Sequence, residues 1–143
     1  MPGRLVATSG GMDPFHVGHL RQLQTASALA GLEGTVVVLL NSDAWLQRKK
    51  GYAFMPWAER RELLLGCRFV DTVVAVDDAD DTVARGLEQY LPEVFVKGGD
   101  RTQLPEAEAQ VCKTHGIQVV FGAGGPKAQS SSDLVQRVRD VAA

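Results

Sequence analysis

Short runs of apolar, β-branched residues alternate with helical patterns along the whole chain. Five runs have the length and composition of buried strands: Arg4–Thr8, Thr35–Leu40, Asp71–Val76, Glu93–Lys97 and Ile117–Phe121. Five other segments carry helical spacing of apolar residues or helix start and stop signals: Val17–Ala30, Pro56–Gly66, Asp80–Tyr90, Pro105–His115 and Ser131–Val141. The alternation predicts a single α/β domain over residues 1–143, built on a doubly wound five-stranded parallel sheet with helices on both faces.

Composition and charge narrow the classes of function. The 143 residues are 45% hydrophobic and 22% charged, with a net charge of −2, as in an ordinary soluble protein. Nucleic acids and anionic membranes select basic surfaces, so neither partner is expected. No apolar run reaches 18 residues, and the N-terminus leads directly into a strand-like run. We therefore expect a cytoplasmic protein with no membrane span and no signal peptide.

The loop after the first predicted strand carries the strongest functional signal. It reads Ser-Gly-Gly-Met-Asp-Pro-Phe-His-Val-Gly-His-Leu from Ser9 to Leu20. His16 and His19 stand three apart at a helix start, where unpaired N–H groups favour an anion. Two imidazoles and free N–H groups suit phosphoryl transfer, which depends on positioning and charge stabilisation. The bare His-x-x-His spacing favours surface or capping histidines, with a metal site next, but the full string reverses that preference.

This string resembles the signature of the His-x-Gly-His nucleotidyltransferase superfamily, which includes cytidylyltransferases and adenylyltransferases. The resemblance implies a Rossmann-like fold in which His16 and His19 contact the nucleotide phosphates and stabilise the transition state. Asp13 matches an Asp of the family, to which we assign the ordering of the loop. Met12 stands where the family usually has Phe. The residues of this loop that the resemblance assigns to nucleotide binding are Gly11, Met12, Asp13 and Gly18.

The loops after the second and third predicted strands add basic residues. A cationic run such as Arg-Lys-Lys at 48–50 is by itself typical of a solvated surface loop. Its place beside the predicted site makes Lys49 and Lys50 candidates for binding a substrate phosphate. Spacing alone leaves open whether Arg60 or Arg61 faces phosphate or solvent.

These segments also carry a narrower resemblance, from Leu5 to about Val138. Asn-Ser-Asp-Ala at 41–44, Lys-Gly at 50–51 and Val-Lys-Gly-Gly-Asp at 96–100 look like the adenylyltransferase domain of the bifunctional enzymes that make ADP-heptose. In that pattern Lys50 and Arg60 fall on the phosphate-contacting Lys and Arg. Glycerol-3-phosphate cytidylyltransferases share the frame but carry Gly-Asp-Asp after the fourth strand.

Two further loops supply candidate nucleotide contacts. A buried strand that ends in glycines lets a nucleoside lie on the backbone, although Gly-Gly-Asp is also a common turn. A Ser before the last helix is an N-cap by default, and three hydroxyls there make a second anion site, like the triphosphate-binding Ser-rich motif of the family. Lys127 stands near the place of an Arg in the cytidylyltransferases. The nucleotide-binding candidates here are Lys97, Gly98, Asp100, Lys127, Ser130, Ser131 and Ser132.

The predicted reaction joins a nucleoside monophosphate to a phosphorylated acceptor. An acceptor phosphate oxygen attacks the α-phosphorus of a nucleoside triphosphate, and pyrophosphate leaves. A phosphate monoester has a second pKa of about 6, so it is a dianion at neutral pH and needs no general base. Mg²⁺ is expected as cofactor, bound mainly through the triphosphate, with no metal site of protein ligands. The resemblance also implies a homodimer.

Several functions stay open at this level. The leading expectation is ATP with a sugar phosphate such as a heptose 1-phosphate, and the alternative is CTP with glycerol 3-phosphate or a related alcohol phosphate. A non-catalytic nucleotide-binding regulatory module is a different class. A zinc hydrolase lacks a third ligand near the two histidines, and Cys67 and Cys112 show no zinc-site spacing.

Overall fold

A parallel sheet forms the centre of the computed structural model, which describes residues 3–99, 101–126 and 129–142. Its strands are β1 (Leu5–Gly10), β2 (Thr35–Leu40), β3 (Thr72–Ala75), β4 (Val94–Gly98) and β5 (Gln118–Ala123), in the order β3-β2-β1-β4-β5. All neighbouring strands pair in parallel. The predicted doubly wound five-stranded sheet is confirmed. The strand order reverses between β1 and β4, where such sheets bind ligands.

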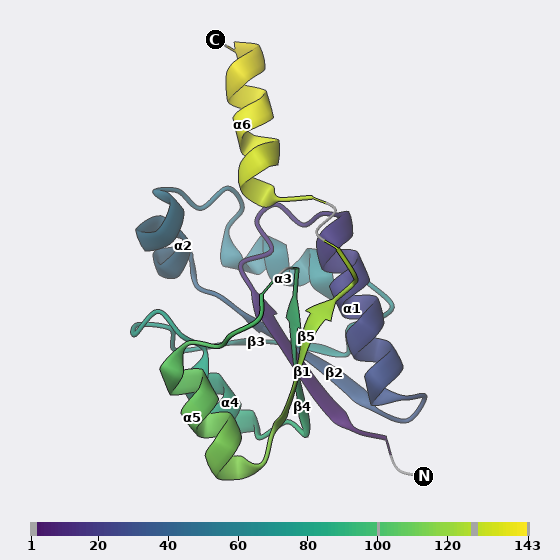
Figure 1. The fold of residues 1–143 in the computed structure, drawn as a ribbon. Helices are drawn as coiled ribbons and strands as arrows, with labels where there is room; N and C mark the ends of the chain where they lie inside the picture. Colours follow the sequence, from purple (N-terminus) through teal and green to yellow (C-terminus); the bar gives the residue numbers. More distant parts are fainter. Residues whose placement is uncertain (1–2, 100, 127–128, 143) are drawn as a thin grey trace.

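Helices cover both faces of this sheet (Figure 1). They are α1 (Val17–Ala30), α2 (Asp43–Lys50), α3 (Trp57–Leu65), α4 (Ala84–Tyr90), α5 (Glu106–His115) and α6 (Ser131–Ala142). The last helix, α6, extends away from the body of the molecule, beyond the end of the sheet where α1 begins. Within the described ranges, no helix has the length and apolar character needed to cross a bilayer.

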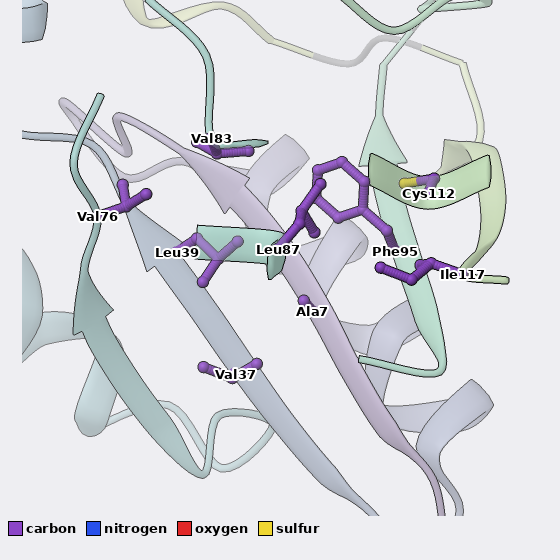
Figure 2. Close-up of a cluster of buried hydrophobic side chains, with 9 residues drawn as sticks. All are labelled: Ala7, Val37, Leu39, Val76, Val83, Leu87, Phe95, Cys112 and Ile117. Atoms are coloured by element: carbon purple, nitrogen blue, oxygen red, sulfur yellow. The ribbon is translucent and has the colours of Figure 1, made fainter. Parts of the chain in front are cut away.

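The two faces of the sheet bury alternate residues of each strand. Figure 2 shows Ala7, Leu39 and Phe95 packed with Leu87 of α4 and Cys112 of α5. The residues between them in the strands pack instead against α1 and α3. Because side chains alternate along a strand, consecutive residues at a strand end also face opposite sides. This alternation decides which side of the site each residue of β4 can reach.

Two helices differ from the sequence prediction. The basic run at 48–50, which the sequence analysis placed in the loop after the second strand, is the last turn of α2. The Ser42 Oγ accepts a hydrogen bond from the Trp45 N–H at the start of this helix, and Gly51, with φ of 83°, follows its end. The helix predicted from Asp80 begins at Ala84, because the Asp80 carboxylate accepts from the Thr82 N–H and holds a turn.

Candidate active site

Two adjoining pockets open at the carboxyl ends of the strands. They share His19, Gln22, Lys49, Lys50, Gly98, Arg101 and Ser131. The first, here called the α5-side pocket, is also lined by Ser9, Gly10, Gly11, Met12, Asn41, Trp45, Thr82, Val83, Lys97 and Glu108. The second, the α6-side pocket, is also lined by His16, Gly18, Gly99, Ala123, Gly124, Gly125, Pro126, Gln129, Ser130 and Ser132. The shared residues make the two pockets one continuous cleft.

The two predicted histidines lie against each other at the start of α1. Their rings are stacked with centroids 3.8 Å apart. The Gly18 N–H donates to His16 Nδ1 at 3.0 Å, and the His16 N–H donates to His19 Nδ1 at 3.2 Å. These bonds cap the helix, so the capping interpretation is confirmed. A ring that accepts at Nδ1 is neutral and carries its proton on Nε2. For His19, capping through Nδ1 therefore leaves Nε2–H as a donor and does not compete with a phosphate-binding role.

The protonation state of His19, which the sequence leaves open, follows from its surroundings. Burial lowers its pKa to about 3, and the electrostatic interactions with His16 and Lys50 act in the same direction. His19 lines both pockets. The central ring of the cleft is thus a neutral hydrogen-bond donor.

Asp13 organises the first loop. Its buried carboxylate accepts hydrogen bonds from the backbone N–H groups of Phe54, at 2.6 Å, and Met55, at 2.8 Å. A carboxylate held by two N–H groups fixes both segments it joins. This position agrees with the loop-ordering role that we assigned to Asp13. It does not line either pocket.

Arg60 occupies a different place from the one that the sequence predicted. Its side chain has no exposed surface and lines neither pocket. The guanidinium donates to the carbonyls of Gly11 and Asn41, each at 2.8 Å, and of Met55, at 2.9 Å. It also pairs with the Asp43 carboxylate at 2.6 Å. The structure therefore corrects the expected phosphate contact: these partners occupy the guanidinium, which joins the loops beneath the cleft.

Lys49 and Lys50 reach the cleft because α2 is held in place by Asp78. The Asp78 carboxylate accepts from Asn41 Nδ2 and from the N–H and Oγ of Ser42, at 2.7–3.0 Å. Both lysines line both pockets. Burial lowers the pKa of Lys50, and the Asp13 charge opposes that shift. The two ammonium groups give the shared part of the cleft a positive end.

The predicted serine cluster forms one wall of the α6-side pocket. Ser130 Oγ accepts from the Asp133 N–H and caps α6, so capping uses one hydroxyl of the three. Ser131 Oγ donates to the Pro14 carbonyl at 2.9 Å and ties α6 to the first loop. Ser132 is exposed at the same wall. The predicted residues Asp100 and Lys127 lie outside the described residues.

At the predicted glycines, backbone atoms line the cleft directly. A Cβ on Gly98 would lie 2.2 Å from Gln22 Oε1, so any larger residue at that strand end would displace the buried Gln22 side chain. A Cβ on Gly18 would lie 2.9 Å from the His16 ring. Gly11 lines the α5-side pocket, as does Met12, which is 2% exposed. These contacts place the predicted glycines and Met12 around the two histidines.

Lys97 lies on the α5 side of the sheet. It follows Phe95 by two residues and therefore shares its face. Its Nζ lies 3.2 Å from Glu108 Oε1 and 3.3 Å from Ser9 Oγ. Burial lowers its pKa, against the opposing charge of Glu108. Lys97 lines the α5-side pocket and is absent from the wall of serines and glycines.

Sequence reasoning missed part of the cleft. Its unforeseen members are the buried Gln22, Asn41 and Glu108, the half-buried Trp45 and the exposed Arg101. Ser42 and Gly51 mark the start and end of α2 and could have placed Trp45 on a helix beside the site. No spacing signal distinguishes Glu108 from an ordinary charge in the first turn of a helix.

A protein-family model described as cytidylyltransferase-like matches residues 7–137. This match spans the histidine loop, the strand ends and the serine wall. The chain belongs to the cytidylyltransferase-like family. It is therefore a nucleotidyltransferase, and the resemblance drawn from the His-x-Gly-His string is confirmed.

Curated relatives agree with this family. The chain is 36% identical over 140 residues to the Bifunctional protein HldE of Geotalea uraniireducens and 39% identical over 140 residues to that of Geobacter metallireducens. The alignments cover 95% and 94% of this chain and 27% of each relative. The Streptomyces coelicolor protein of the same name is 38% identical over 83% of the chain. The chain thus spans about a quarter of the length of these relatives.

Solved structures show the same fold. The lipopolysaccharide core biosynthesis protein from Thermoplasma volcanium has a TM-score of 0.68 at 21% identity, covering 84% of this chain and 94% of that one. A protein from Archaeoglobus fulgidus has a TM-score of 0.61 at 18% identity, covering 91% and 95%. These likenesses support the Rossmann-like architecture.

Proposed function

We propose that this chain transfers adenylate from ATP to a sugar phosphate, such as a heptose 1-phosphate, and releases pyrophosphate. The observation that carries the proposal is the stacked histidine pair at the start of α1, with the neutral His19 lining both pockets together with two lysines and Ser131. The relatives described as bifunctional HldE and the resemblance to ADP-heptose-forming enzymes support a sugar phosphate as acceptor. Homodimer formation stays a prediction.

The two pockets suggest a division between the substrates. The α6-side pocket offers backbone and hydroxyl groups from Gly98, Gly124 and Ser130–Ser132, which suit a triphosphate chain and a flat nucleoside. The acceptor then enters from the α5-side pocket. His19, Lys49 and Lys50 line both pockets, where the acceptor phosphate would meet the α-phosphorus. This arrangement would place the attacking and leaving oxygens on opposite sides of the reacting group.

The proposed chemistry uses neutral donors and cations. The acceptor phosphate oxygen forms a bond to the α-phosphorus as the bond to the bridging oxygen of pyrophosphate breaks. Nε2–H of His19 and the ammonium of Lys50 stabilise the charge that moves onto the α-phosphate and the pyrophosphate. A phosphate dianion needs no base, which fits a His19 whose pKa, at about 3, is too low for it to accept a proton readily at neutral pH. Arg60 and Asp13 are positioning residues in this scheme.

We propose that magnesium enters with the triphosphate. Among the residues that the structure describes, no group of three or more His, Cys, Asp or Glu side chains could hold a metal ion. The carboxylates nearest the cleft are already engaged, Asp13 by backbone N–H groups and Glu108 by Lys97 and the Val83 N–H. Mg²⁺ commonly binds through substrate phosphates with few protein ligands.

Pyrophosphate release tests the proposal. The protein is incubated with each of the four nucleoside triphosphates, Mg²⁺ and a panel that includes a heptose 1-phosphate, other sugar 1-phosphates and glycerol 3-phosphate. We expect ATP and a sugar 1-phosphate to give the highest turnover. Preference for CTP and glycerol 3-phosphate would replace the adenylyltransferase assignment with the cytidylyltransferase one. ATP binding without pyrophosphate release from any acceptor would favour a regulatory module.

A further inference from the structure

The cleft contains two cationic ends with different electrostatic character. Lys49 and Lys50 lie together on the last turn of α2 and line the cleft with His19, whose pKa the charge of Lys50 lowers. Lys97 lies at the far end, where the Glu108 carboxylate is 3.2 Å from its Nζ. The first end has an excess positive charge, whereas at the second the charge of Lys97 is balanced by Glu108, and the exposed Arg101, which lines both pockets, is the further cation that acts on Lys97. The buried pair itself therefore attracts a phosphate less than the two lysines do.

The ion pair is almost completely buried, yet it lines the α5-side pocket. The exposed fraction is 7% for Lys97 and 2% for Glu108. Glu108 Oε2 accepts from the Val83 N–H at 3.1 Å. Glu108 Oε1 meets no hydrogen-bond geometry among the described residues and is held only by its ion pair with the Lys97 ammonium. A carboxylate oxygen held in this way can accept a further hydrogen bond from a ligand that reaches the pair.

The position of Glu108 follows from the fold. Glu108 lies one turn before Cys112 on α5, and Cys112 packs beside Phe95 of β4 (Figure 2). Residues four apart on a helix share a face, so Glu108 faces the same strand nearer its carboxyl end. Lys97 is two residues beyond Phe95 on that strand. A helix and a strand thus hold the pair rigidly at the inner wall of the pocket.

We infer that the Lys97–Glu108 pair is a specificity-determining site that binds a hydroxyl group on the carbon skeleton of the acceptor. The hydroxyl accepts from the Lys97 ammonium and, with a small shift of the Glu108 side chain, donates its hydrogen to the Glu108 carboxylate. The acceptor phosphate meanwhile lies at Lys49 and Lys50. The preferred substrates are therefore phosphate esters of polyhydroxylated compounds, and simple alkyl phosphates are excluded. This inference rests on the proposed function and assigns Lys97 to the acceptor rather than to the nucleotide.

The assignment of the Lys97–Glu108 pair to the acceptor is tested by comparing deoxy acceptors in the wild-type protein and in a Glu108 variant. The best acceptor of the sugar phosphate panel is compared with its monodeoxy analogues in the wild-type protein and in Glu108→Gln. In the wild type, one deoxy analogue should lose roughly 10- to 100-fold in kcat/KM, as expected when a hydrogen bond to a charged group is lost. Glu108→Gln should lose a similar factor with the full acceptor. The two losses should not add, because both remove one interaction.

Two controls separate recognition from folding. Glu106→Gln removes the same charge from an exposed position of the same helix turn and should behave as wild type. The double variant Lys97→Met/Glu108→Leu replaces the buried pair by apolar groups, so no unpaired charge remains in the core. It should keep the thermal unfolding temperature and the KM for ATP while losing the deoxy discrimination.

The outcomes distinguish this inference from the proposed function. If pyrophosphate forms but no deoxy analogue is discriminated, or if the losses in Glu108→Gln add to those of the analogue, the assignment of the pair is wrong and the transferase assignment stands. If no acceptor of the panel releases pyrophosphate, the proposed function itself fails and this inference fails with it. If Glu108→Gln changes the KM for ATP and leaves the acceptor KM unchanged, Lys97 belongs to the nucleotide-binding site, as the sequence analysis predicted.

Discussion

The two pockets of the cleft are lined by different kinds of chemical groups. The α6-side pocket is lined by glycines, serines and backbone around the start of α6, whereas long side chains such as Asn41, Trp45, Lys97 and Glu108 line much of the α5-side pocket. Backbone and hydroxyl groups suit phosphates, which all nucleoside triphosphates share. Side chains from several strand ends and helices can select one carbon skeleton. We therefore propose that the α6-side pocket binds the nucleotide, that the α5-side pocket selects the acceptor, and that the residues common to both carry the reaction.

Substitution of a residue that lines both pockets should lower turnover more than any other change. His19→Asn removes a neutral donor that lines both pockets, and we expect kcat to fall by about 10²–10³, the usual cost of one transition-state donor. His115→Asn, at an exposed position in the last turn of α5, is the matched control and should keep full turnover. A His19 variant with unchanged kcat would remove the histidine pair from the mechanism.

Arg60 lies beneath the pockets, and its substitution tests whether this residue supports the stability of the fold rather than the binding of ATP. Arg60→Met leaves the carbonyls of Gly11, Asn41 and Met55 without their donor. We expect the free energy of unfolding to fall by about 3 kcal/mol, as when a buried charged partner is lost. Chemical denaturation measures this, with the exposed neighbour variant Arg61→Met as control. A stable Arg60→Met protein with impaired ATP binding would support the phosphate contact that the sequence predicted.

The lowered pKa of His19 predicts a pH-dependent stability. The folded protein holds this ring neutral down to a pKa of about 3, whereas the unfolded chain takes up a proton near pH 6.5. The free energy of unfolding should therefore fall as the pH drops below 6.5, by about 1.4 kcal/mol for each unit well below that value. Denaturation at pH 7, 6 and 5 should show this slope in the wild type and a shallower one in His19→Asn. Equal slopes in the two proteins would mean that burial does not lower the pKa of His19.

Two further substitutions test whether each pocket binds a different substrate, and we expect their effects to be the smallest. Ser132→Ala removes a hydroxyl from the α6-side pocket, and Trp45→Ala removes a ring from the α5-side pocket. Each should raise one KM by about tenfold, the worth of one moderate contact. We expect the Ser132 change to act on ATP and the Trp45 change on the acceptor. Initial-rate kinetics with both substrates varied would show a reversed or mixed pattern if the division is wrong.

The same contrast explains how much the sequence could predict. The sheet and most helices follow from local patterns. The His-x-Gly-His string and Ser130–Ser132 are contiguous motifs that line the α6-side pocket, and His19 and Ser131 line the other pocket as well. In the α5-side pocket only the run Ser9–Met12 is contiguous, because Asn41, Lys97 and Glu108 meet only when parallel strands align their ends. The phosphate contact of Arg60 followed from the family resemblance, which does not show that loop carbonyls surround its guanidinium.

The most direct test of the account follows the label from radioactive ATP. With the best acceptor and [α-³²P]ATP, the account predicts that the label appears in the acceptor-linked product, while [γ-³²P]ATP yields labelled pyrophosphate only. The central claim is that the histidine pair stabilises attack on the α-phosphorus. Label from the γ-position on the acceptor, or release of labelled inorganic phosphate by the protein itself, would contradict it.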